Sequence, residues 1–241
     1  MLIQDYRISL WNYFWYYTDG SLEDVIGEIR AAGRGIELWD RWKADRDLYQ
    51  PKYHARLRAA TEGMKVSLHS RGCQGRDDHL AQFETARAVG ADVVVVHVAH
   101  FPGGDGAVDL ALMKEMAGRC RDAGMCMALE NVPGANLPEA FDTCGDALGF
   151  CFDTGHREGR ADFFEHFLGA FGDRLVHIHL QDPEPRDDHW ELGTGVNTAE
   201  EWKQLKAHLR KIDYAGAAVF EIRPRRPDAI AERSIRFLEG L

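Results

Sequence analysis

The chain has 241 residues and a formal net charge of −10, and its apolar content is ordinary for a globular protein. This length suits one α/β barrel of about 250 residues or two small domains, and no stretch approaches the roughly 20 apolar residues needed to cross a bilayer. The negative charge argues against a large nucleic-acid surface, which is usually basic, although bound cations would cancel part of it. The five cysteines have no C-x-x-C spacing, so we expect reduced thiols in a cytoplasmic protein.

Strand-like segments recur along the whole chain. The opening residues lack the charged and apolar regions of a signal peptide, so they are predicted to form a strand instead. The predicted strands are short, largely apolar runs: Arg7–Trp11, Gly35–Trp39, Lys65–His69, Asp92–His97, Cys126–Glu130, Gly149–Asp153, Leu175–His179 and Ala217–Ile222.

Helical patterns occupy the intervals between these strands. Residues 21–33 begin with a serine N-cap and an acidic first turn and end in a glycine, which predicts a helix. The other helices are predicted by apolar residues three and four apart: 77–91, 110–124, 161–172, 198–212 and Asp228–Leu241. The charged and aromatic segment Asp40–Tyr53 is predicted to be a loop or short helix over one end of the sheet.

This alternation predicts an α/β fold. Eight strands and about eight helices, repeating at intervals of about 30 residues, fit a single (β/α)8 TIM barrel. No linker rich in proline or serine divides the chain, so we expect one domain over residues 1–241. A doubly wound open sheet is the alternative, but no G-x-G-x-x-G follows the first strand.

Metal-binding residue types recur at the predicted strand ends. Six strands end in an imidazole or a carboxylate: His69, His97, Glu130, Asp153, His179 and Glu221. Three more such residues follow close behind: His156, Asp187 and His189. Because functional groups of a (β/α)8 barrel gather at the carboxyl ends of its strands, all nine donors would meet at one mouth. Nitrogen and oxygen donors suit divalent metals, so we predict a metal site there.

The roles of the remaining histidines are predicted from their positions in the predicted strands, loops and helices. Strand side chains alternate, so His177 shares the face of His179 one layer deeper, where it would support that residue rather than bind metal itself. His100, in the loop after His97, is open to either role. Four histidines fall in helical patterns and are predicted to lie at the surface: His54, His79, His166 and His208.

Five segments resemble the xylose isomerase-like barrel superfamily. They are ALENVPGANL, LGFCFDTGH, VHIHLQD, DDHWELGTGVNTAEEW and GAAVFEIRP. The superfamily contains sugar isomerases and epimerases and also the endonuclease IV class of DNA-repair enzymes. The resemblance covers nearly the whole chain and is more specific for the fold than for the reaction.

Resemblance to the single-metal sugar epimerases implies an Mn²⁺ or similar ion held by four residues: Glu130, Asp153, His179 and Glu221. In that pattern Glu130 and Glu221 also move protons on opposite faces of the substrate, through a metal-stabilised enediolate. The substrate would be a small sugar, a sugar phosphate or a related polyol. The predicted substrate-binding residues are His156, Arg157, Arg223, Trp11 and Trp39.

Resemblance to endonuclease IV implies instead three Zn²⁺ ions held by all nine donors, with Glu130 bridging metals. That alternative predicts hydrolysis of abasic-site DNA or a smaller phosphate ester. The loops after Glu130 and Asp153 are short, and no run of basic or wedge residues would flip a nucleotide, which favours a small carbohydrate. Two further activities stay open: a barrel that binds a polyol without turnover, and a dehydratase of a cyclic polyol. The chain could hold one to three metal ions, and it could form a homo-oligomer.

Overall fold

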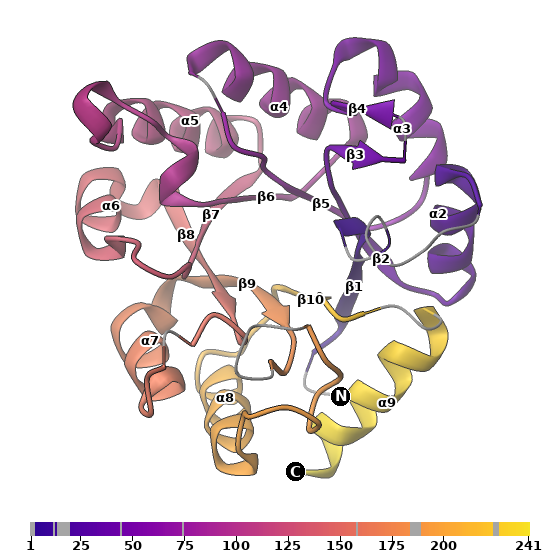
Figure 1. Ribbon diagram of the computed structural model, residues 1–241, viewed down its shortest axis with the longest axis vertical. Helices are drawn as coiled ribbons and strands as arrows, with labels where there is room; N and C mark the ends of the chain where they lie inside the picture. Colours follow the sequence, from indigo (N-terminus) through magenta and orange to yellow (C-terminus); the bar gives the residue numbers. More distant parts are fainter. Residues whose placement is uncertain are drawn as a thin grey trace.

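Eight parallel strands close into a barrel. The computed structural model describes residues 3–11, 13, 20–43, 45–73, 75–157, 159–183, 189–223 and 227–241. The strands follow one another around the barrel in the order β1-β10-β9-β8-β7-β6-β5-β2 (Figure 1). Their bounds are β1 Asp5–Ser9, β2 Gly35–Leu38, β5 Val66–His69, β6 Val93–Val96, β7 Cys126–Glu130, β8 Leu148–Asp153, β9 Leu175–Leu180 and β10 Ala217–Phe220. The predicted (β/α)8 barrel is confirmed.

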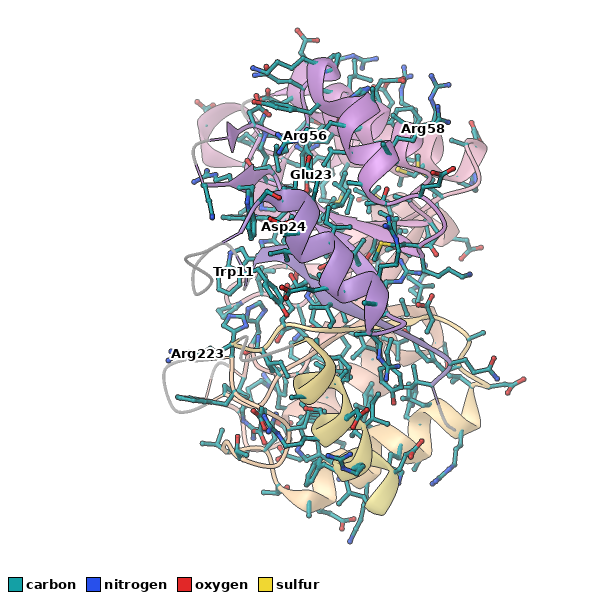
Figure 2. The ribbon with its side chains drawn as sticks, turned by 90° about the vertical axis from the view of Figure 1, so that its right-hand side faces the viewer. Trp11, Glu23, Asp24, Arg56, Arg58 and Arg223 are labelled. Carbon is teal, nitrogen blue, oxygen red and sulfur yellow. The ribbon has the colours of Figure 1, made fainter. Side chains whose placement is uncertain are left out.

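In the part of the chain that the structure describes, α-helices surround the barrel and cover the outer face of its strands (Figure 1). They are α2 Leu22–Ala31, α3 His54–Ala60, α4 Arg76–Val89, α5 Leu110–Asp122, α6 Leu137–Cys144, α7 Phe163–Phe171, α8 Ala199–Lys211 and α9 Pro227–Gly240. Ser21 caps α2 by accepting from the Asp24 amide, as the sequence predicts. Figure 2 shows Glu23 of α2 beside Arg56 of α3, with which it forms an exposed ion pair. None of the described helices has the length and apolar content to span a membrane.

Several predicted boundaries were wrong. The first strand ends at Ser9, and Trp11 is helical, so the apolar run continued past the strand. His97 and Glu221 directly follow β6 and β10 instead of ending them. The segment Asp40–Tyr53 contains a two-stranded hairpin and a 3-10 turn; these are β3 Arg41–Trp42, β4 Asp45–Arg46 and η1 Pro51–Tyr53.

The strands have two apolar faces of different size. On the outer face, Phe150 and Phe152 of β8 pack against Phe163 and Phe167 of α7, with ring centroids 5.5–6.4 Å apart. On the inner face, residues of β6, β7 and β8 form a small separate cluster: Val93, Val95, Ala128 and Cys151. The alternation of side chains along each strand separates these faces. Small apolar residues inside the barrel leave room for polar groups at both of its ends.

An ion pair between a buried arginine and a partly exposed aspartate closes the amino-terminal end. Arg7 of β1 is 1% exposed, and its guanidinium donates two hydrogen bonds of 2.6 Å to Asp92, the residue before β6. It also binds Asp5 at 2.7 Å. Because β2 and β5 lie between β1 and β6, this bidentate pair crosses the barrel interior.

Gly216 stands where β10 begins and has no room for a side chain. A Cβ there would collide with the Val176 carbonyl oxygen and would lie 2.6 Å from the Tyr214 hydroxyl. Gly216→Ala should lower the free energy of unfolding by about 1–3 kcal/mol, because backbone cannot yield easily. Urea titration followed by circular dichroism measures the change. Gly118→Ala in α5 meets no atom within 4 Å and should raise stability, by about 0.5–1 kcal/mol; equal effects of the two variants would contradict the collision.

Candidate functional site

A cavity of about 320 Å³ opens at the carboxyl ends of the barrel strands. Eight of the predicted site residues line it: Trp11, Trp39, His69, His97, Glu130, His156, His189 and Glu221. Asp153 and His179 lie beside them and are fully buried. A larger hollow of about 680 Å³ between α3 and α4 contains none of the predicted metal ligands. The strand ends therefore gather the donors as the topology predicts.

His179 is the centre of the donor group. Its Nδ1 lies 3.3 Å from Glu130 Oε1, 3.7 Å from Asp153 Oδ2 and 3.7 Å from Glu221 Oε2. Within the described residues, this buried nitrogen has no hydrogen-bond partner. Three carboxylate oxygens around one unpartnered imidazole nitrogen are a donor set that suits a divalent ion.

The turn after β8 fixes Asp153. Its Oδ1 accepts from the amides of Gly155, at 2.6 Å, and His156, at 3.1 Å. Gln181 donates to both carboxylate oxygens at 3.0–3.1 Å. A Cβ at Gly155 would collide with the Gln181 side chain, so glycine permits this close packing. One oxygen lone pair of the Asp153 carboxylate can thus face the mouth in a fixed direction.

His69 and His97 approach Glu130 from the other side. Their Nε2 atoms lie 3.3 and 2.9 Å from Glu130 Oε2. His69 donates its Nδ1 proton to the Ser70 carbonyl oxygen at 2.8 Å, which leaves Nε2 available as a donor to an ion. Both oxygens of Glu130 therefore contact imidazole nitrogens, because its Oε1 already faces His179.

His156 and His189 complete the described part of the predicted ligand set. His156 Nδ1 lies 3.2 Å from Glu130 Oε1 and 3.1 Å from the Asn131 carbonyl oxygen. His189 donates Nδ1 to the Glu221 carbonyl oxygen at 2.8 Å, and its ring lies 4.5 Å from that of Trp11. Asp187, the ninth predicted ligand, lies outside the described residues.

The charges of the cluster oppose the effect of burial. Burial raises the pKa of the Glu130 carboxyl, but His179 and His97 outweigh it, and the pKa lies well below its usual value. Burial lowers the pKa of His69, but its contact with Glu130 outweighs this and raises it to about 9. Burial also raises the pKa of Asp153, which His156 and His179 bring below its usual value. The carboxylates thus stay ionised and attract positive charge, whether protons or a metal ion.

Sequence reasoning missed Glu37. This fully buried residue of β2 lies next to His177 and His179 inside the barrel. The one feature of the sequence that could have revealed Glu37 is an acidic residue within the apolar strand GIELW, at a position that faces the barrel interior. His177 lies one layer below His179, as the alternation of strand side chains predicts, and contacts Glu37; its supporting role stays a prediction.

His100 lines the cavity and forms a buried network with Ser70 and His79. Ser70 donates to His100 Nδ1 at 2.5 Å, and burial, with the charges of His97 and His69, lowers the pKa of His100 to about 2. His79 donates Nε2 to the His100 carbonyl oxygen at 2.9 Å. The prediction that His79 lies at the surface was wrong: His79 is buried, because the loop after β6, which contains His100, covers it. His54 and His208 are partly exposed and His166 is exposed.

Neither of the two arginines predicted to bind substrate lines the cavity. Arg157 contacts Asn197 at 2.5 Å and Glu201 at 2.8 Å. Arg223 stacks on Trp190, 4.7 Å from the ring centroid. In Figure 2 Trp11 and Arg223 lie on the same side of the molecule. The cavity is instead lined by Arg41 and Arg71.

The shape of the chain has counterparts among solved structures. A D-tagatose 3-epimerase-like protein is 18% identical, with 98% of each chain covered and a TM-score of 0.71. D-allulose 3-epimerase from Methylomonas sp., solved with D-allulose, is 18% identical, with 98% of this chain and 96% of that chain covered and a TM-score of 0.70. The TTHB071 protein from Thermus thermophilus, soaked with ZnCl₂, is 22% identical, with 100% and 97% covered and a TM-score of 0.68.

Comparison with curated protein sequences gave no match. The family described as xylose isomerase-like TIM barrel matches residues 26–241, which is most of the chain and includes every predicted metal ligand. The match agrees with the closed barrel and with the resemblance found in the sequence. The chain belongs to the xylose isomerase-like TIM barrel family.

Proposed function

We propose that the protein is a divalent-metal-dependent isomerase or epimerase of a small sugar or related polyol. The supporting observation is the convergence of four residues from consecutive strand ends on one point, with His179 Nδ1 within 3.3–3.7 Å of the other three. The four are Glu130, Asp153, His179 and Glu221. A Mn²⁺ or Zn²⁺ ion held there would act as a Lewis acid toward a carbonyl and its neighbouring hydroxyl.

We assign the transfer of the proton to two glutamates. Glu130 ends β7 and Glu221 follows β10, so two strands separate them around the barrel, and both line the cavity. Ser9 donates to Glu221 Oε1 at 3.1 Å, which orients that carboxylate. One glutamate can therefore remove a proton from one face of a bound sugar while the other delivers a proton to the opposite face.

The cavity favours a substrate without a phosphate. Arg71 lies 2.8 Å from Asp47 and 3.5 Å from Asp78, and Arg41 lies 3.4 Å from Asp40. Carboxylates thus already neutralise both arginines of the lining. The rings of Trp11 and Trp39, 6.3 Å apart, offer an apolar wall. We therefore infer an uncharged sugar in preference to a sugar phosphate.

Phosphoester hydrolysis is the second candidate. Glu130 Oε2 lies 3.3 Å from His69 and 2.9 Å from His97, while Oε1 faces His156 and His179. A carboxylate with imidazoles at both oxygens has the arrangement needed to bridge two metal ions, which could activate water and stabilise a leaving oxygen.

Elemental analysis and turnover distinguish the two candidates. The isomerase predicts about one ion per chain, conversion of ketoses and no cleavage of abasic DNA. The hydrolase predicts two or three zinc ions and the reverse activities. Conversion of neither ketoses nor their phosphates at full metal occupancy would reject the first proposal.

All five cysteines are free thiols, which fits a cytoplasmic protein.

His189→Ala tests how many ions are needed. The His189 ring lies 4.5 Å from the Trp11 ring, tilted by 41°, and donates a hydrogen bond to the Glu221 carbonyl oxygen, at the edge of the four converging ligands. We expect the variant to keep its principal ion and to raise KM with little change in kcat, since it removes a substrate contact. Metal content and steady-state kinetics measure this, with His166→Ala on the exposed face of α7 as control. Loss of one zinc together with most activity would favour the hydrolase.

A further inference from the structure

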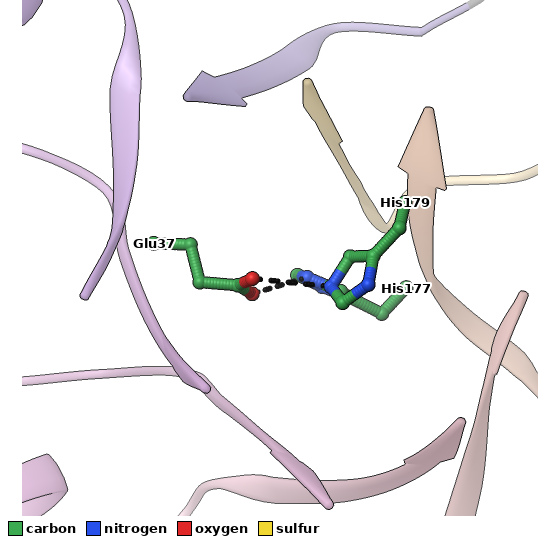
Figure 3. A group of neighbouring side chains, drawn as sticks. All are labelled: Glu37, His177 and His179. Atoms are coloured by element: carbon green, nitrogen blue, oxygen red, sulfur yellow. Dashed lines mark hydrogen bonds and ion pairs between the residues drawn. The ribbon is translucent and has the colours of Figure 1, made fainter. Parts of the chain in front are cut away.

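A buried carboxylate lies across the barrel interior, below the converging ligands. Glu37 is fully buried on β2, and the proposed reaction gives it no role. β1 and β10 lie between β2 and β9 in the barrel, yet the Glu37 side chain extends toward His177 and His179 of β9 (Figure 3). A buried carboxylate is costly unless its oxygens are paired, so its contacts determine what it can do.

Each oxygen of Glu37 faces one imidazole. His177 donates its Nε2 proton to Oε2 at 2.9 Å, and His179 Nε2 lies 3.1 Å from Oε1. The Nδ1 of His177 has no hydrogen-bond partner in the described part of the chain. His177 therefore uses its one described polar contact to hold the carboxylate in place.

The two nitrogens of His179 face opposite groups. Nε2 faces Glu37, whereas Nδ1 faces the three carboxylates of the mouth at 3.3–3.7 Å. A metal ion needs an imidazole nitrogen without a proton. If the ring proton is on Nε2, Nδ1 presents its lone pair to the mouth; the other tautomer would block it with a proton.

We propose that Glu37 positions His179 for metal binding: its negative charge, 3.1 Å from Nε2, favours the ring proton on that nitrogen and so leaves the Nδ1 lone pair facing the mouth. This inference rests on the metal centre of the proposed function. A carboxylate partner fixes the tautomer and the orientation of a metal-binding histidine and makes it a stronger donor. Glu37 is thus a positioning residue, which acts on the ion through His179.

Glu37→Gln keeps the shape of the side chain and one oxygen acceptor but removes the charge. The chelator-treated protein is titrated with Zn²⁺ or Co²⁺ alone in competition with a chromophoric chelator, without any sugar. We expect E37Q to bind either ion about 10–100-fold more weakly than the parent. We also expect its Co²⁺ visible absorption bands to shift, because the donor strength of His179 changes. A role limited to packing would leave that spectrum unchanged.

Ser67→Ala is the matched control. Ser67 pairs with Glu37 in the strand register, is fully buried, and its hydroxyl has no hydrogen-bond partner among the described residues. S67A should keep the parental affinity and the parental Co²⁺ spectrum. His177→Gln is a second variant, which leaves Glu37 present but less firmly held, and it should weaken binding less than E37Q. If E37Q does not fold, a parental affinity in folded H177Q overturns the inference.

The outcomes separate this inference from the proposal beneath it. Parental affinity and spectrum in folded E37Q overturn the positioning role while leaving the metal centre intact. Equal losses in E37Q and S67A also overturn it, because they indicate a general effect of packing. A parent protein that binds neither Zn²⁺ nor Co²⁺ overturns the metal centre and the positioning role together.

Discussion

Glu221→Gln will abolish the exchange of substrate protons with solvent while the barrel stays folded. Glutamine preserves the acceptor for the Ser9 hydroxyl, 3.1 Å away, but it cannot take up a proton. Loss of a general base or acid typically slows a reaction about 10²–10⁴-fold, and we expect at least a 100-fold loss here. Proton magnetic resonance of a ketose in heavy water, at saturating metal, measures the exchange.

Glu201→Gln is the control for this variant. Glu201 is also a buried carboxylate, but it pairs with Arg157 and does not line the cavity. It should leave the exchange rate at the parental value. Exchange at the parental rate in E221Q would show that the two-glutamate mechanism is wrong, provided that circular dichroism confirms the fold.

Asp153→Asn will remove most metal binding. The asparagine Oδ1 can still accept from the Gly155 and His156 amides, so the turn after β8 is kept. The charge that would face the ion is lost. Because Asp153 would be a direct ligand, we expect a loss of affinity larger than the roughly 10–100-fold that follows removal of an outer partner. Competition with a chelator measures it, and activity should fall in parallel.

Asp182→Asn provides the comparison. Asp182 is as buried as Asp153 and lies two residues beyond β9, but its carboxylate accepts from the amides of Gly193 and Asn197. Its replacement can disturb that loop without touching the converging ligands. A D153N protein that binds Zn²⁺ as tightly as D182N would exclude Asp153 from the metal centre.

The strands that bear the ligands could be predicted because their apolar runs end sharply. β7 was predicted to the residue, and β8 and β9 differ by one residue at one end. In each case an apolar run stops at a carboxylate or an imidazole that faces the mouth. The end of β1 was wrong because Leu10 and Trp11 continue the apolar run into a helix. Hydrophobicity alone does not distinguish these two conformations.

Contacts between distant segments could not be predicted in the same way. Glu37 and His177 are 140 residues apart, and only closure of the barrel brings them together. His79 lies on an amphipathic helix, where its position indicates exposure. The loop after β6 covers it, however, and Phe101 stacks on its ring at 4.1 Å. Periodicity describes one element at a time, whereas burial depends on which other elements pack against it.

The ion pair between Arg7 and Asp92 stabilises the barrel at a distance from the residues that would determine substrate preference. It ties β1 to β6 at the amino-terminal end of the barrel, whereas the groups that would handle substrate follow the opposite ends of the strands. Residues at the mouth can therefore change during evolution without weakening the ion pair between Arg7 and Asp92. A descendant could acquire a new preference among sugars there while inheriting the same scaffold.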